Sequence, residues 1–389
     1  MKIFYVDISG RVTKYNDALC KELCEASHGE NELYFFSSDT ICTEEGLKRV
    51  KMLSLIPKQY KSSHSFLKRI IKVVEIIANY FLLLGYLWKE KVDIIHFQWL
   101  PLMDYIGLES FILKVIILIA PRTRIILTIH NVYPHNITPK SKILYKKRFV
   151  KVSRFINSYI VHTNATKKEV VENFGIKEND IYVVHHGVFI PKILDVKENK
   201  RNDKIMRFIM YGNQGHYKGT DILVDAALML PESYKSKSEF KIVGNISPVF
   251  YNELKNKTDK DSVKVDWMPY FVDDKMLYQE IIDSDVIVLP YRAISQSGVL
   301  LLALYFEKLI ITSDLVSFKE TLDTFTDDMF FKNENIKDLS ELLKRYINHE
   351  MNFDIIKGQI RALKEKYTWN TAAIKTISIY NSEKSDIII

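Results

Sequence analysis

The chain has 389 residues, of which 47% are hydrophobic and 26% charged, and its formal net charge is +7. This length and composition exclude both a disordered chain and a single small domain, and they favour two globular domains of about 100–200 residues. The charge is uneven, with 28 Lys and Arg against 19 Asp and Glu in residues 1–195 and 27 against 29 in the rest. The basic first half indicates either solvated helix faces or attraction to an anionic surface, such as lipid or a polyphosphate-linked substrate. Nucleic acid is not expected as a partner, because no binding module is recognisable.

The N-terminus starts directly with the strand-like "MKIFYVDISG" and lacks the layout of a signal peptide, so we expect a cytoplasmic protein. The three cysteines lie near the N-terminus without a nearby histidine, which favours reduced core thiols over a disulfide or a zinc site. The apolar run 73–88 contains Glu75 and Asn79. These polar residues indicate a buried or interfacial helix rather than one that spans a membrane.

Apolar strand-like runs alternate with helical periodicity along the whole chain. Nearly continuous apolar strands separated by helices are typical of parallel sheets that are buried on both faces. Two such blocks predict an α/β protein with two doubly wound, Rossmann-like domains facing across a cleft. The predicted strands are 2–8, 32–38, 92–98, 124–130, 158–163 and 181–187 in the first block, and 206–212, 239–245, 263–268, 285–291 and 308–314 in the second.

The polar and charged segment 191–204 has the composition of a linker. It predicts an N-terminal domain over 1–190 and a second domain over 205–364. Ligands of open parallel sheets bind beyond the carboxyl ends of the strands. We therefore expect the functional residues to lie just after the strands.

Polar residues close several strands of the first block. His96 and Trp99 follow one strand, and His130, Asn131 and His135 follow the next along the chain. A lone histidine at a strand end is usually structural, whereas two within six residues beside an asparagine favour a pocket. Both interpretations stay open at this point. The stretches "HTN" and "HHG" repeat the pattern more weakly.

Two loops of the second block combine glycine with the start of a helix. After the strand 206–212 the chain reads "YGNQGHYKGTDIL", which places Lys218 among glycines. Further on, Ser297 can cap a helix over 297–306, and Gly298 lets a phosphate approach the backbone. First-turn amides attract anions and lysine adds a point charge, so the two loops predict a diphosphate site. A simple capped turn and a surface lysine are the structural alternative.

These stretches resemble the nucleotide-sugar-binding domain of GT-B fold glycosyltransferases, and in particular the retaining family 4 enzymes of bacterial surface-polysaccharide assembly. The resemblance is carried by "YGNQGHYKGTDIL", "MPYFVDDKMLYQEIIDSDVIVLPY" and "SQSGVLLLALYFEKLIITSD", with "TIHNVYPHN" and "HHG" on the acceptor side. The stretch "EKYTWNTAAIKTISIY" is similar to the C-terminal helix of that family. Residues 365–389 are therefore expected to pack back on the first domain.

The resemblance implies a metal-independent hexosyltransferase without a cofactor. It would move a sugar from a UDP- or GDP-linked donor, with retention, to a hydroxyl of a glycan or of a lipid-diphosphate-linked saccharide. Capsule or O-antigen synthesis at the inner face of the plasma membrane would be its setting. The implied catalytic residues are His130 and Lys218, the donor-binding residues Gly212, Asn213, Lys218, Ser297, Gly298, Val299 and Glu320, and the acceptor-binding residues His96, Trp99, Asn131 and His135.

The sequence also departs from the family pattern. Two glutamates eight residues apart are usual in the family, and they would fall on Ser295 and Ala303. Their absence leaves the recognition of the nucleotide ribose open, and it supports an alternative, a catalytically degenerate protein that binds a glycan or a partner. Glu307 aligns with a turn glycine of the family. The "DSD" of 283–285 imitates a metal-binding motif, but we expect it to cap a helix and start a strand.

Overall fold

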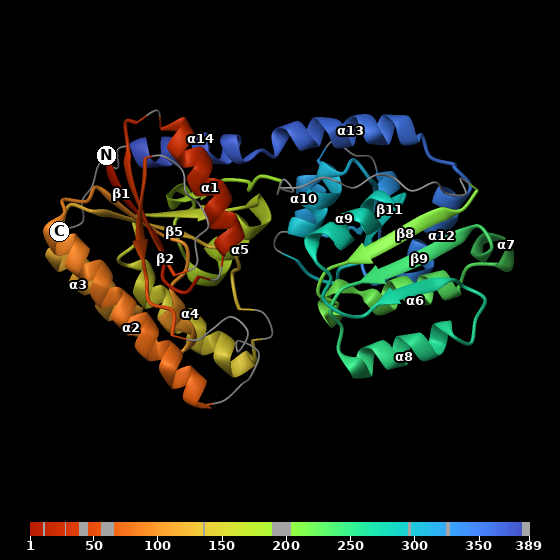
Figure 1. Cartoon of the computed structure of the whole chain (residues 1–389), viewed down its shortest axis with the longest axis horizontal. Coiled ribbons are helices and arrows are strands. Elements are labelled where there is room, and N and C mark those ends of the chain that lie inside the picture. The colour runs from red at the N-terminus through yellow and green to blue at the C-terminus, as the bar shows by residue number, and fades with distance from the viewer. Residues whose placement is uncertain are drawn as a thin grey trace. The chain divides into compact units, whose positions relative to one another are not determined.

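The structure, a computed structural model, describes the chain except for residues 11, 28, 39–45, 56–65, 135–136, 189–203, 295–296, 324–326 and 383–389. It has two compact units (Figure 1): Met1–Gly187 with Trp369–Ile389, and Val188–Thr368. Each unit is a parallel sheet flanked by helices, so the predicted α/β class is confirmed. The predicted linker, except for its last residue, lies outside the described residues.

The first unit is built on a seven-stranded sheet in the order β3-β2-β1-β4-β5-β6-β7, with all neighbours parallel. Successive strands are added toward one edge of the sheet from β1 to β3 and toward the other edge from β4 to β7. The carboxyl ends of β1 and β4 are therefore the switch point where ligands of such sheets bind. The sequence prediction missed β3, because its "LKRVK" is mostly charged, as suits an edge strand. The strands are β1 (Lys2–Asp7), β2 (Glu32–Ser37), β3 (Leu47–Lys51), β4 (Ile94–Phe97), β5 (Arg124–Thr128), β6 (Ser158–Val161) and β7 (Ile181–Val183).

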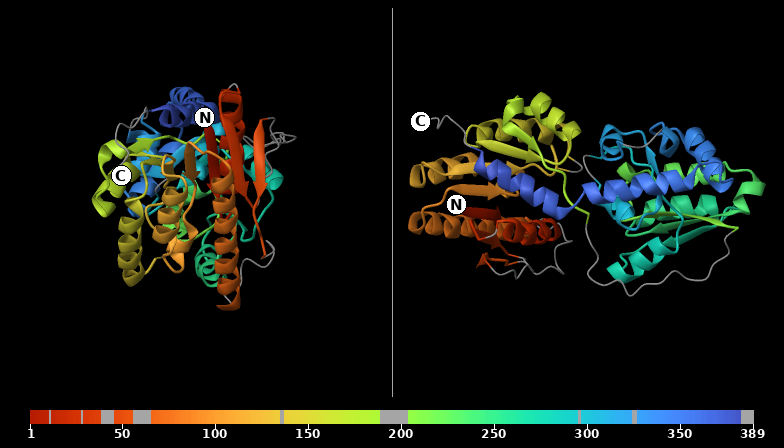
Figure 2. Two further views of the ribbon diagram at one scale, coloured as in Figure 1. Left: turned by 90° about the vertical axis from the view of Figure 1, so that its left-hand side faces the viewer. Right: turned by 90° about the horizontal axis from the view of Figure 1, so that it is seen from above.

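Helices cover both faces of this sheet. In Figures 1 and 2, α14 lies with α1 on one face, and α2, α3 and α4 lie together on the other. Their apolar sides bury the core against the strands. The helices are α1 (Thr13–Ala26), α2 (Phe66–Lys89), α3 (Glu109–Ile119), α4 (Pro139–Ser153), α5 (Asn164–Phe174) and α14 (Trp369–Asn381), with short 3₁₀ turns at Pro101–Asp104 and Glu178–Asp180.

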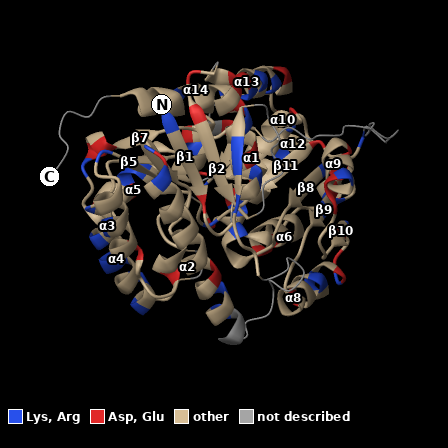
Figure 3. Cartoon of the chain, turned by 60° about the vertical axis from the view of Figure 1, so that its left-hand side comes forward, with Lys and Arg blue, Asp and Glu red and all other residues tan. Residues whose placement is uncertain are grey.

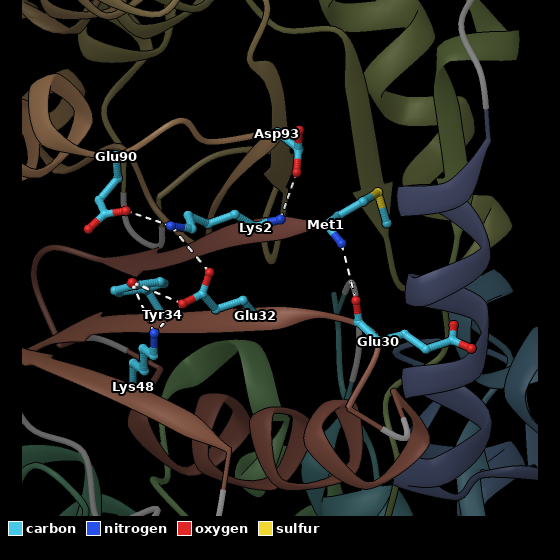
Figure 4. Close-up of polar contacts among 8 residues, drawn as sticks. All are labelled: Met1, Lys2, Glu30, Glu32, Tyr34, Lys48, Glu90 and Asp93. Atoms are coloured by element: carbon cyan, nitrogen blue, oxygen red, sulfur yellow. Dashed lines mark hydrogen bonds and ion pairs between the residues drawn. The ribbon is translucent and has the colours of Figure 1, made fainter.

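Ion pairs tie the strands together at the edge of the sheet opposite the switch point (Figure 4). Lys2 Nζ lies 2.5 Å from Glu90 and 3.2 Å from Glu32, and Lys48 pairs with Glu32 as well. Hydrogen bonds from Lys48 and Lys2 lower the pKa of Glu32 to about 2. These groups are close to solvent, and their role is to hold three strand starts in register rather than to bind a ligand.

The last helix is fixed to the first unit at both of its ends. The guanidinium of Arg124 donates to the carbonyls of Tyr380 and Ser382 at 2.9 and 2.8 Å, and so satisfies the free end of α14. At the other end, a Cβ on Gly187 would come within 2.4 Å of the amide nitrogen of Trp369. Only glycine lets the chain pass that close.

The second unit has a six-stranded parallel sheet in the order β10-β9-β8-β11-β12-β13. Its central strands β8, β11 and β12 are mostly apolar and buried, whereas β9 and the edge strand β10 also carry charged residues. The two-residue β13 was not predicted, because so short a strand leaves no pattern. The strands are β8 (Met206–Tyr211), β9 (Ser238–Val243), β10 (Val265–Met268), β11 (Val286–Leu289), β12 (Leu309–Ser313) and β13 (Phe330–Phe331).

Helices also cover both faces of the second sheet. The helix α6 packs beside α8 and α12, while α10 packs beside α13. The helices are α6 (Thr220–Leu228), α7 (Glu232–Lys235), α8 (Pro248–Thr258), α9 (Asp274–Ile282), α10 (Gly298–Tyr305), α11 (Val316–Thr321), α12 (Ile336–Ile347) and α13 (Phe353–Lys366), with 3₁₀ turns at His216–Lys218 and Asp327–Met329.

Candidate active site

The loop between β8 and α6 is pressed tightly against its neighbours. Gly212 follows β8 with a φ of +100°, and its amide donates to the carbonyl of Val243 at 2.9 Å. Gly219 precedes α6 with a φ of +72°, and a Cβ there would come within 1.9 Å of the carbonyl oxygen of Pro290. These positive φ angles and close approaches favour glycine at both positions. The glycines seen in the sequence therefore bring this loop onto the carboxyl end of β11.

Lys218 is buried in this loop, with only 5% of its surface exposed. Its Nζ donates to the carbonyl of Tyr211 at 3.3 Å and lies 5.1 Å from the centre of the Tyr291 ring. A Cβ on Gly212 would come within 2.6 Å of that nitrogen. Within the described ranges no carboxylate lies within 4.0 Å of it. Burial lowers the pKa of Lys218 to about 8, so at neutral pH the loop holds a cation that lacks an anion.

The helix α10 begins beside the same loop. Ser297 caps it, since its Oγ accepts the amide of Leu300 at 3.2 Å, and the predicted helix and cap are confirmed. Gly298 is exposed at the first turn, where the amides are not used by the helix. The rest of "GVLLLALY" is apolar and anchors the helix in the core. Its start is therefore a rigid, positively polarised surface.

Contacts between the loop and α10 bring the predicted donor residues together. Tyr211 Oη donates to the carbonyl of Val299 at 2.8 Å. A Cβ on Gly212 would lie 3.6 Å from the side chain of Val299, on the side where Lys218 Nζ lies. Backbone amides, a glycine surface and a buried ammonium thus meet at the carboxyl ends of β8 and β11. This combination suits a phosphate or diphosphate.

No contact with Lys218 is described for the two other residues predicted to bind the donor, Asn213 and Glu320. Asn213 is exposed in the loop after Gly212, where its carbonyl accepts the amide of Gly215 at 3.0 Å. Glu320 is half-buried on α11, and with burial and Asp323 it raises the pKa of Tyr367. Its contact with a donor stays a prediction.

The positions of the two absent glutamates differ in what the structure shows. Ser295 lies outside the described residues. Ala303 is fully buried in the core of the second unit. Glu307 has a φ of +52°, as its alignment with a turn glycine predicted, and it pairs with Arg361 at 2.8 Å and Lys364 at 3.1 Å. Glu307 is thus engaged in surface ion pairs.

In the first unit, three neighbouring strands each have a histidine at or just beyond their carboxyl end. His96 lies within β4, His130 follows β5 and His162 follows β6, so all three meet near the carboxyl edge of the sheet. Tyr15 of α1 packs its ring edge-on to His130, with centroids 4.8 Å apart. Parallel pairing of β4, β5 and β6 explains why residues about 32 positions apart become neighbours.

A small pocket lies at this edge, lined by Trp99, His130 and Asn131 together with Met103 and Tyr145. Three of the predicted first-unit site residues are therefore brought together. His96 is fully buried and does not line this pocket. His135 lies outside the described residues.

The assignment of His96 to acceptor binding is corrected by its surroundings. Its Nδ1 lies 2.7 Å from Tyr380 Oη and its Nε2 lies 2.7 Å from Thr128 Oγ1, and no part of its surface is exposed. A ring enclosed in this way supports its neighbours and does not touch an acceptor.

The histidines of this edge are electrically neutral at pH 7. Burial lowers the pKa of His96 and of His162 to about 3, and that of His186 to about 4. Burial, followed by the neighbouring histidines, lowers the pKa of His130 well below its usual value. The first unit therefore offers neutral hydrogen-bonding groups where the second offers a cation.

The sequence prediction missed several members of this cluster. Gln98 follows a strand in the same way as the predicted residues, so the strand-end pattern alone was enough to find it, and His162 belongs to the stretch "HTN" that showed the pattern weakly. Tyr15 and Tyr380 lie on helices far away in the sequence and left no comparable signal.

Among the described residues, no three His, Cys, Asp or Glu side chains gather as a metal site would need. Within "DSD", Asp283 ends α9 and accepts from Gln279 at 2.9 Å, and Asp285 accepts the amide of Arg207 at 2.9 Å. Both carboxylates thus hold structure, as expected. Metal independence of the reaction stays a prediction.

Comparisons with known proteins agree with this arrangement. Residues 17–190 match the family described as Glycosyltransferase Family 4, and residues 206–349 match Glycosyl transferases group 1. No curated protein sequence matches the chain.

Solved structures share the fold. The lipopolysaccharide outer core galactosyltransferase WaaB is 16% identical with a TM-score of 0.64, covering 97% of this chain and 100% of that one. HepE of Anabaena in complex with UDP is 11% identical with a TM-score of 0.67, covering 98% and 100%. The catalytic domain of starch synthase IV from Arabidopsis thaliana, bound to ADP and acarbose, is 12% identical with a TM-score of 0.69, covering 97% and 98%. At such low identities these likenesses establish the fold alone.

The two family matches together span most of the chain, and each falls on one of the two units. The chain belongs to the glycosyltransferases of GT-B fold, with a first unit of the family 4 type and a second unit of the group 1 type. This membership supports transfer of a sugar from a nucleotide sugar.

Proposed function

We propose that the protein is a retaining hexosyltransferase that takes a sugar from a UDP- or GDP-linked donor and needs no metal. The observation that carries the proposal is Lys218, a buried cation that has no carboxylate partner among the residues that the structure describes, beside Gly212 and the first turn of α10. A diphosphate is the ligand that satisfies all three groups at once. UDP and UDP-glucose are bound by HepE of Anabaena in its solved complexes, which makes uridine donors the first to test.

The chemistry follows from where negative charge develops. The anomeric carbon becomes oxocarbenium-like as the glycosidic bond to the diphosphate breaks, so the leaving group gains charge. Preorganised donors that face this charge stabilise the transition state. Lys218 and the amides of Gly298 and Val299 supply such donors, which is the work that a metal does in other transferases. Retention is the outcome implied by the resemblance to family 4.

The first unit would contact the transferred sugar and the acceptor. His130 and Asn131 offer neutral hydrogen-bonding groups, and Trp99 offers an apolar ring in the same pocket. Neutral donors and acceptors beside an aromatic ring suit sugar hydroxyls and C–H faces. We assign His130 to the transferred sugar and the rest of the pocket to the acceptor.

Purified protein should transfer or hydrolyse a UDP- or GDP-sugar in the presence of EDTA, and the same donor should raise its melting temperature. Lys218→Met should abolish both effects. Lys235→Met is the matched control, because Lys235 is equally buried in the second unit but pairs with Asp261 at 2.7 Å. If a donor panel gives neither transfer, hydrolysis nor stabilisation, the transferase proposal is wrong, and the degenerate binding protein takes its place.

The helices α2, α3 and α4 suggest where the acceptor comes from. From Arg69 on they carry three, one and six Lys or Arg residues in turn, and Figure 3 draws Lys and Arg in blue. Their two acidic residues, Glu75 and Glu109, are both fully buried. No carboxylate of these three helices therefore faces solvent, which favours an anionic partner.

The same helices expose large apolar side chains. The stretch Arg69–Lys89 of α2 is long and apolar enough to cross a membrane, with a mean hydropathy of 1.8, and a third of it is buried in the fold. Glu75 and Asn79 are fully buried and accept the amides of Leu55 and Leu53. In this fold α2 is therefore packed on the sheet by one side. Its other side and α3 expose Phe81, Trp88, Phe111 and Leu118, each by 65% or more.

Basic and apolar groups on one layer fit the surface of an anionic bilayer. We therefore propose a peripheral protein at the cytoplasmic face of the plasma membrane, with a lipid-diphosphate-linked saccharide of capsule or O-antigen synthesis as acceptor. It should float with vesicles of phosphatidylglycerol and phosphatidylcholine at low salt. Triple substitution of Phe81, Trp88 and Phe111 by Ser should weaken binding at least ~10-fold, while Phe271→Ser, an exposed site of the second unit, should not. Equal flotation of both variants would exclude this surface.

A further inference from the structure

The ring of His130 is held by a buried chain of hydrogen bonds within the first unit. Its Nδ1 lies 3.1 Å from His162 Nε2, and its Nε2 lies 3.3 Å from the side-chain amide of Gln98. The same amide lies 3.0 Å from His96 Nε2, and His96 Nδ1 lies 2.7 Å from Tyr380 Oη. Gln98 and His96 are fully buried, and Tyr380 is nearly so. A chain of five side chains thus connects the C-terminal helix to the candidate active site.

The carbonyl of Val184 determines which group donates and which accepts in each of these hydrogen bonds. His162 Nδ1 lies 2.9 Å from the carbonyl oxygen of Val184, which can only accept, so this nitrogen carries the proton. The Nε2 of neutral His162 is therefore bare and accepts from Nδ1–H of His130. It follows that neutral His130 has its bare nitrogen, Nε2, toward Gln98.

The amide of Gln98 then has one orientation that satisfies every partner. As placed, Oε1 of Gln98 faces His130 and its Nε2 faces His96. A half-turn of the amide interchanges these two atoms, so that the nitrogen donates to His130 Nε2 and the oxygen accepts from Nε2–H of His96. Thr128 Oγ1, 2.7 Å from His96 Nε2, then accepts from the same N–H. His96 is left with a bare Nδ1, which accepts the hydroxyl proton of Tyr380. Each bond thus fixes the proton position of the next, from Tyr380 through to Val184.

We propose that Gln98 and Tyr380 are positioning residues for His130: they hold its proton on Nδ1 and keep Nε2 as the acceptor for a substrate hydroxyl. This proposal rests on the proposed function, in which His130 contacts the transferred sugar. Both ring nitrogens of His130 are already bonded, and the 3.3 Å bond to Gln98 is the longest of the chain. A sugar hydroxyl that donates to Nε2 is the group that replaces Gln98 most readily, and an anion is excluded because it has no proton to give.

The groups around His130 preserve this neutral state. It faces Gln98 from the β4 side, His162 after β6 and the ring of Tyr15 from α1, and His186 lies beyond Tyr15. Burial is the main cause that lowers the pKa of His130, and the charge–charge contributions that add to it come from neighbouring histidines. The neutral imidazole is the form in which a single proton defines the acceptor nitrogen.

The experiment measures the proton positions and the activity separately. Long-range ¹H–¹⁵N spectra of the whole protein report which nitrogen of His130 is protonated, and steady-state kinetics with a UDP-sugar report kcat and KM. In the native chain His130 should show the Nδ1–H form. In Tyr380→Phe the hydroxyl donor to His96 is lost, so His130 should become a mixture of both forms, and kcat should fall ~10-fold with the donor KM unchanged.

Gln98→Glu gives a second, signed outcome. A carboxylate next to His130 and His96 favours the charged imidazole, so the titration midpoint of His130 should rise by about 1 unit or more. Gln98→Met, which fills the same space without hydrogen bonds, should instead give mixed forms without that rise.

Tyr5→Phe is the matched control. Tyr5 is also fully buried in the first unit and packs on His96. Its hydroxyl, however, donates to Asn16 at 3.0 Å, which is not part of the hydrogen-bonded series from Tyr380 to His162. It should leave the His130 spectrum and kcat unchanged. Identical spectra for the native chain, Tyr380→Phe and Gln98→Met would overturn the proposal. Full activity of His130→Ala would instead remove the role of His130 in the proposed function, while the spectra would still decide whether the chain sets its proton.

Discussion

The residues at the carboxyl ends of the strands are neutral in the first unit and include a buried cation in the second. In the first unit, His96, His130 and His162 are neutral and bonded to one another or to buried partners. In the second unit, Lys218 is buried as a cation with one long bond to a carbonyl. The first set is satisfied without a ligand, whereas the second is not.

This difference shows that one architecture can prepare two kinds of binding. Satisfied neutral groups exchange partners with hydroxyls at little cost, because each bond lost is replaced by a similar one. An unsatisfied buried cation makes the unliganded fold less stable and the anion-bound form more stable by contrast. The division matches a donor diphosphate on the second unit and sugar hydroxyls on the first.

Acid gives the largest test of the comparison. The folded-state pKa values of His96, His162 and His186 lie below the ordinary histidine value of 6.5. The unfolded chain therefore binds more protons below pH 6.5, and stability that is complete above 6.5 is lost as pH falls toward 4 and 3. Each such histidine contributes about 1.4 kcal/mol per pH unit in this window.

Hydrogen exchange followed peptide by peptide should show the first unit losing protection between pH 6 and 4.5 before the second unit does. The second unit has two histidines, His216 and His349, and both are exposed. His186→Phe should flatten the pH dependence of the free energy of unfolding by about one proton. Simultaneous loss of protection in both units, with no change in His186→Phe, would contradict the contrast.

Lys218→Met should affect binding and stability in opposite directions. Loss of a cation that faces developing charge should lower kcat/KM for the donor by about 10²–10³-fold. Removal of an unpaired buried charge should raise the free energy of unfolding at pH 7 by on the order of 3 kcal/mol, since its folded pKa is about 8 against 10.5. Denaturant unfolding and donor kinetics measure the two effects.

The pH dependence gives Lys218 a second signature. Because its folded pKa is lowered, the native chain should gain stability as pH rises from about 8 to 10.5, and Lys218→Met should lack this gain. Donor affinity should fall over the first part of the same window, as the ammonium loses its proton. Lys235→Met should lose stability, because its pair with Asp261 is broken. If Lys218→Met lost stability in the same way, Lys218 would be a structural residue.

The sequence predicted the second site better than the first. Gly212 and Lys218 lie in the loop after β8, and Val299 lies in the first turn of α10, which follows β11. The carboxyl ends of parallel strands must meet at one edge. Their local signals, glycine and a helix cap, need no distant partner to be read. This is why the sequence could indicate that these three residues lie together, as the structure shows. Their contact with a donor stays a prediction.

The first site depends on contacts that sequence patterns do not show. His96 looked like His130, since both are near strand ends, but Tyr380 of the last helix covers one and not the other. That contact joins residues 284 positions apart. The edge strand β3 was missed for a related reason, because its charged residues are explained only by its place beside β2.

Gly212→Ala tests the donor site of the second unit. Its Cβ would lie 2.6 Å from Lys218 Nζ, at a φ of +100°, so the ammonium must move and the backbone is strained. Donor affinity should fall ~10-fold and the free energy of unfolding by about 1–2 kcal/mol. Gly175→Ala shares the positive φ, at +68°, but its Cβ would meet nothing within 4 Å. Gly175→Ala should lower the free energy of unfolding but leave donor affinity unchanged. Equal losses of affinity in the two variants would show that Gly212 is not part of the donor site.

Glu109 gives the smallest effect and tests whether the first unit tolerates charge at all. It is fully buried, and neither carboxylate oxygen has a hydrogen-bond partner within the described part of the chain. Burial raises its pKa well above the usual value, against smaller opposing contributions from nearby backbone amides. Such an acid binds its proton more tightly in the folded state, so stability is lost as pH rises from 4.5 through the folded pKa.

Glu109→Gln removes this loss and should stabilise the first unit by about 1 kcal/mol at pH 8, which corresponds to a rise of about 2–4 °C in melting temperature, with little gain at pH 5. Glu75→Gln is the matched control, since Glu75 is equally buried but pairs with Lys72 at 2.5 Å and accepts the amide of Leu55 at 2.7 Å. That variant should be destabilised, because it leaves a cation without its partner. If both glutamine variants lose stability, the first unit holds Glu109 as a charge, and its contrast with the lysine-bearing second unit is smaller than its neutral histidines indicate.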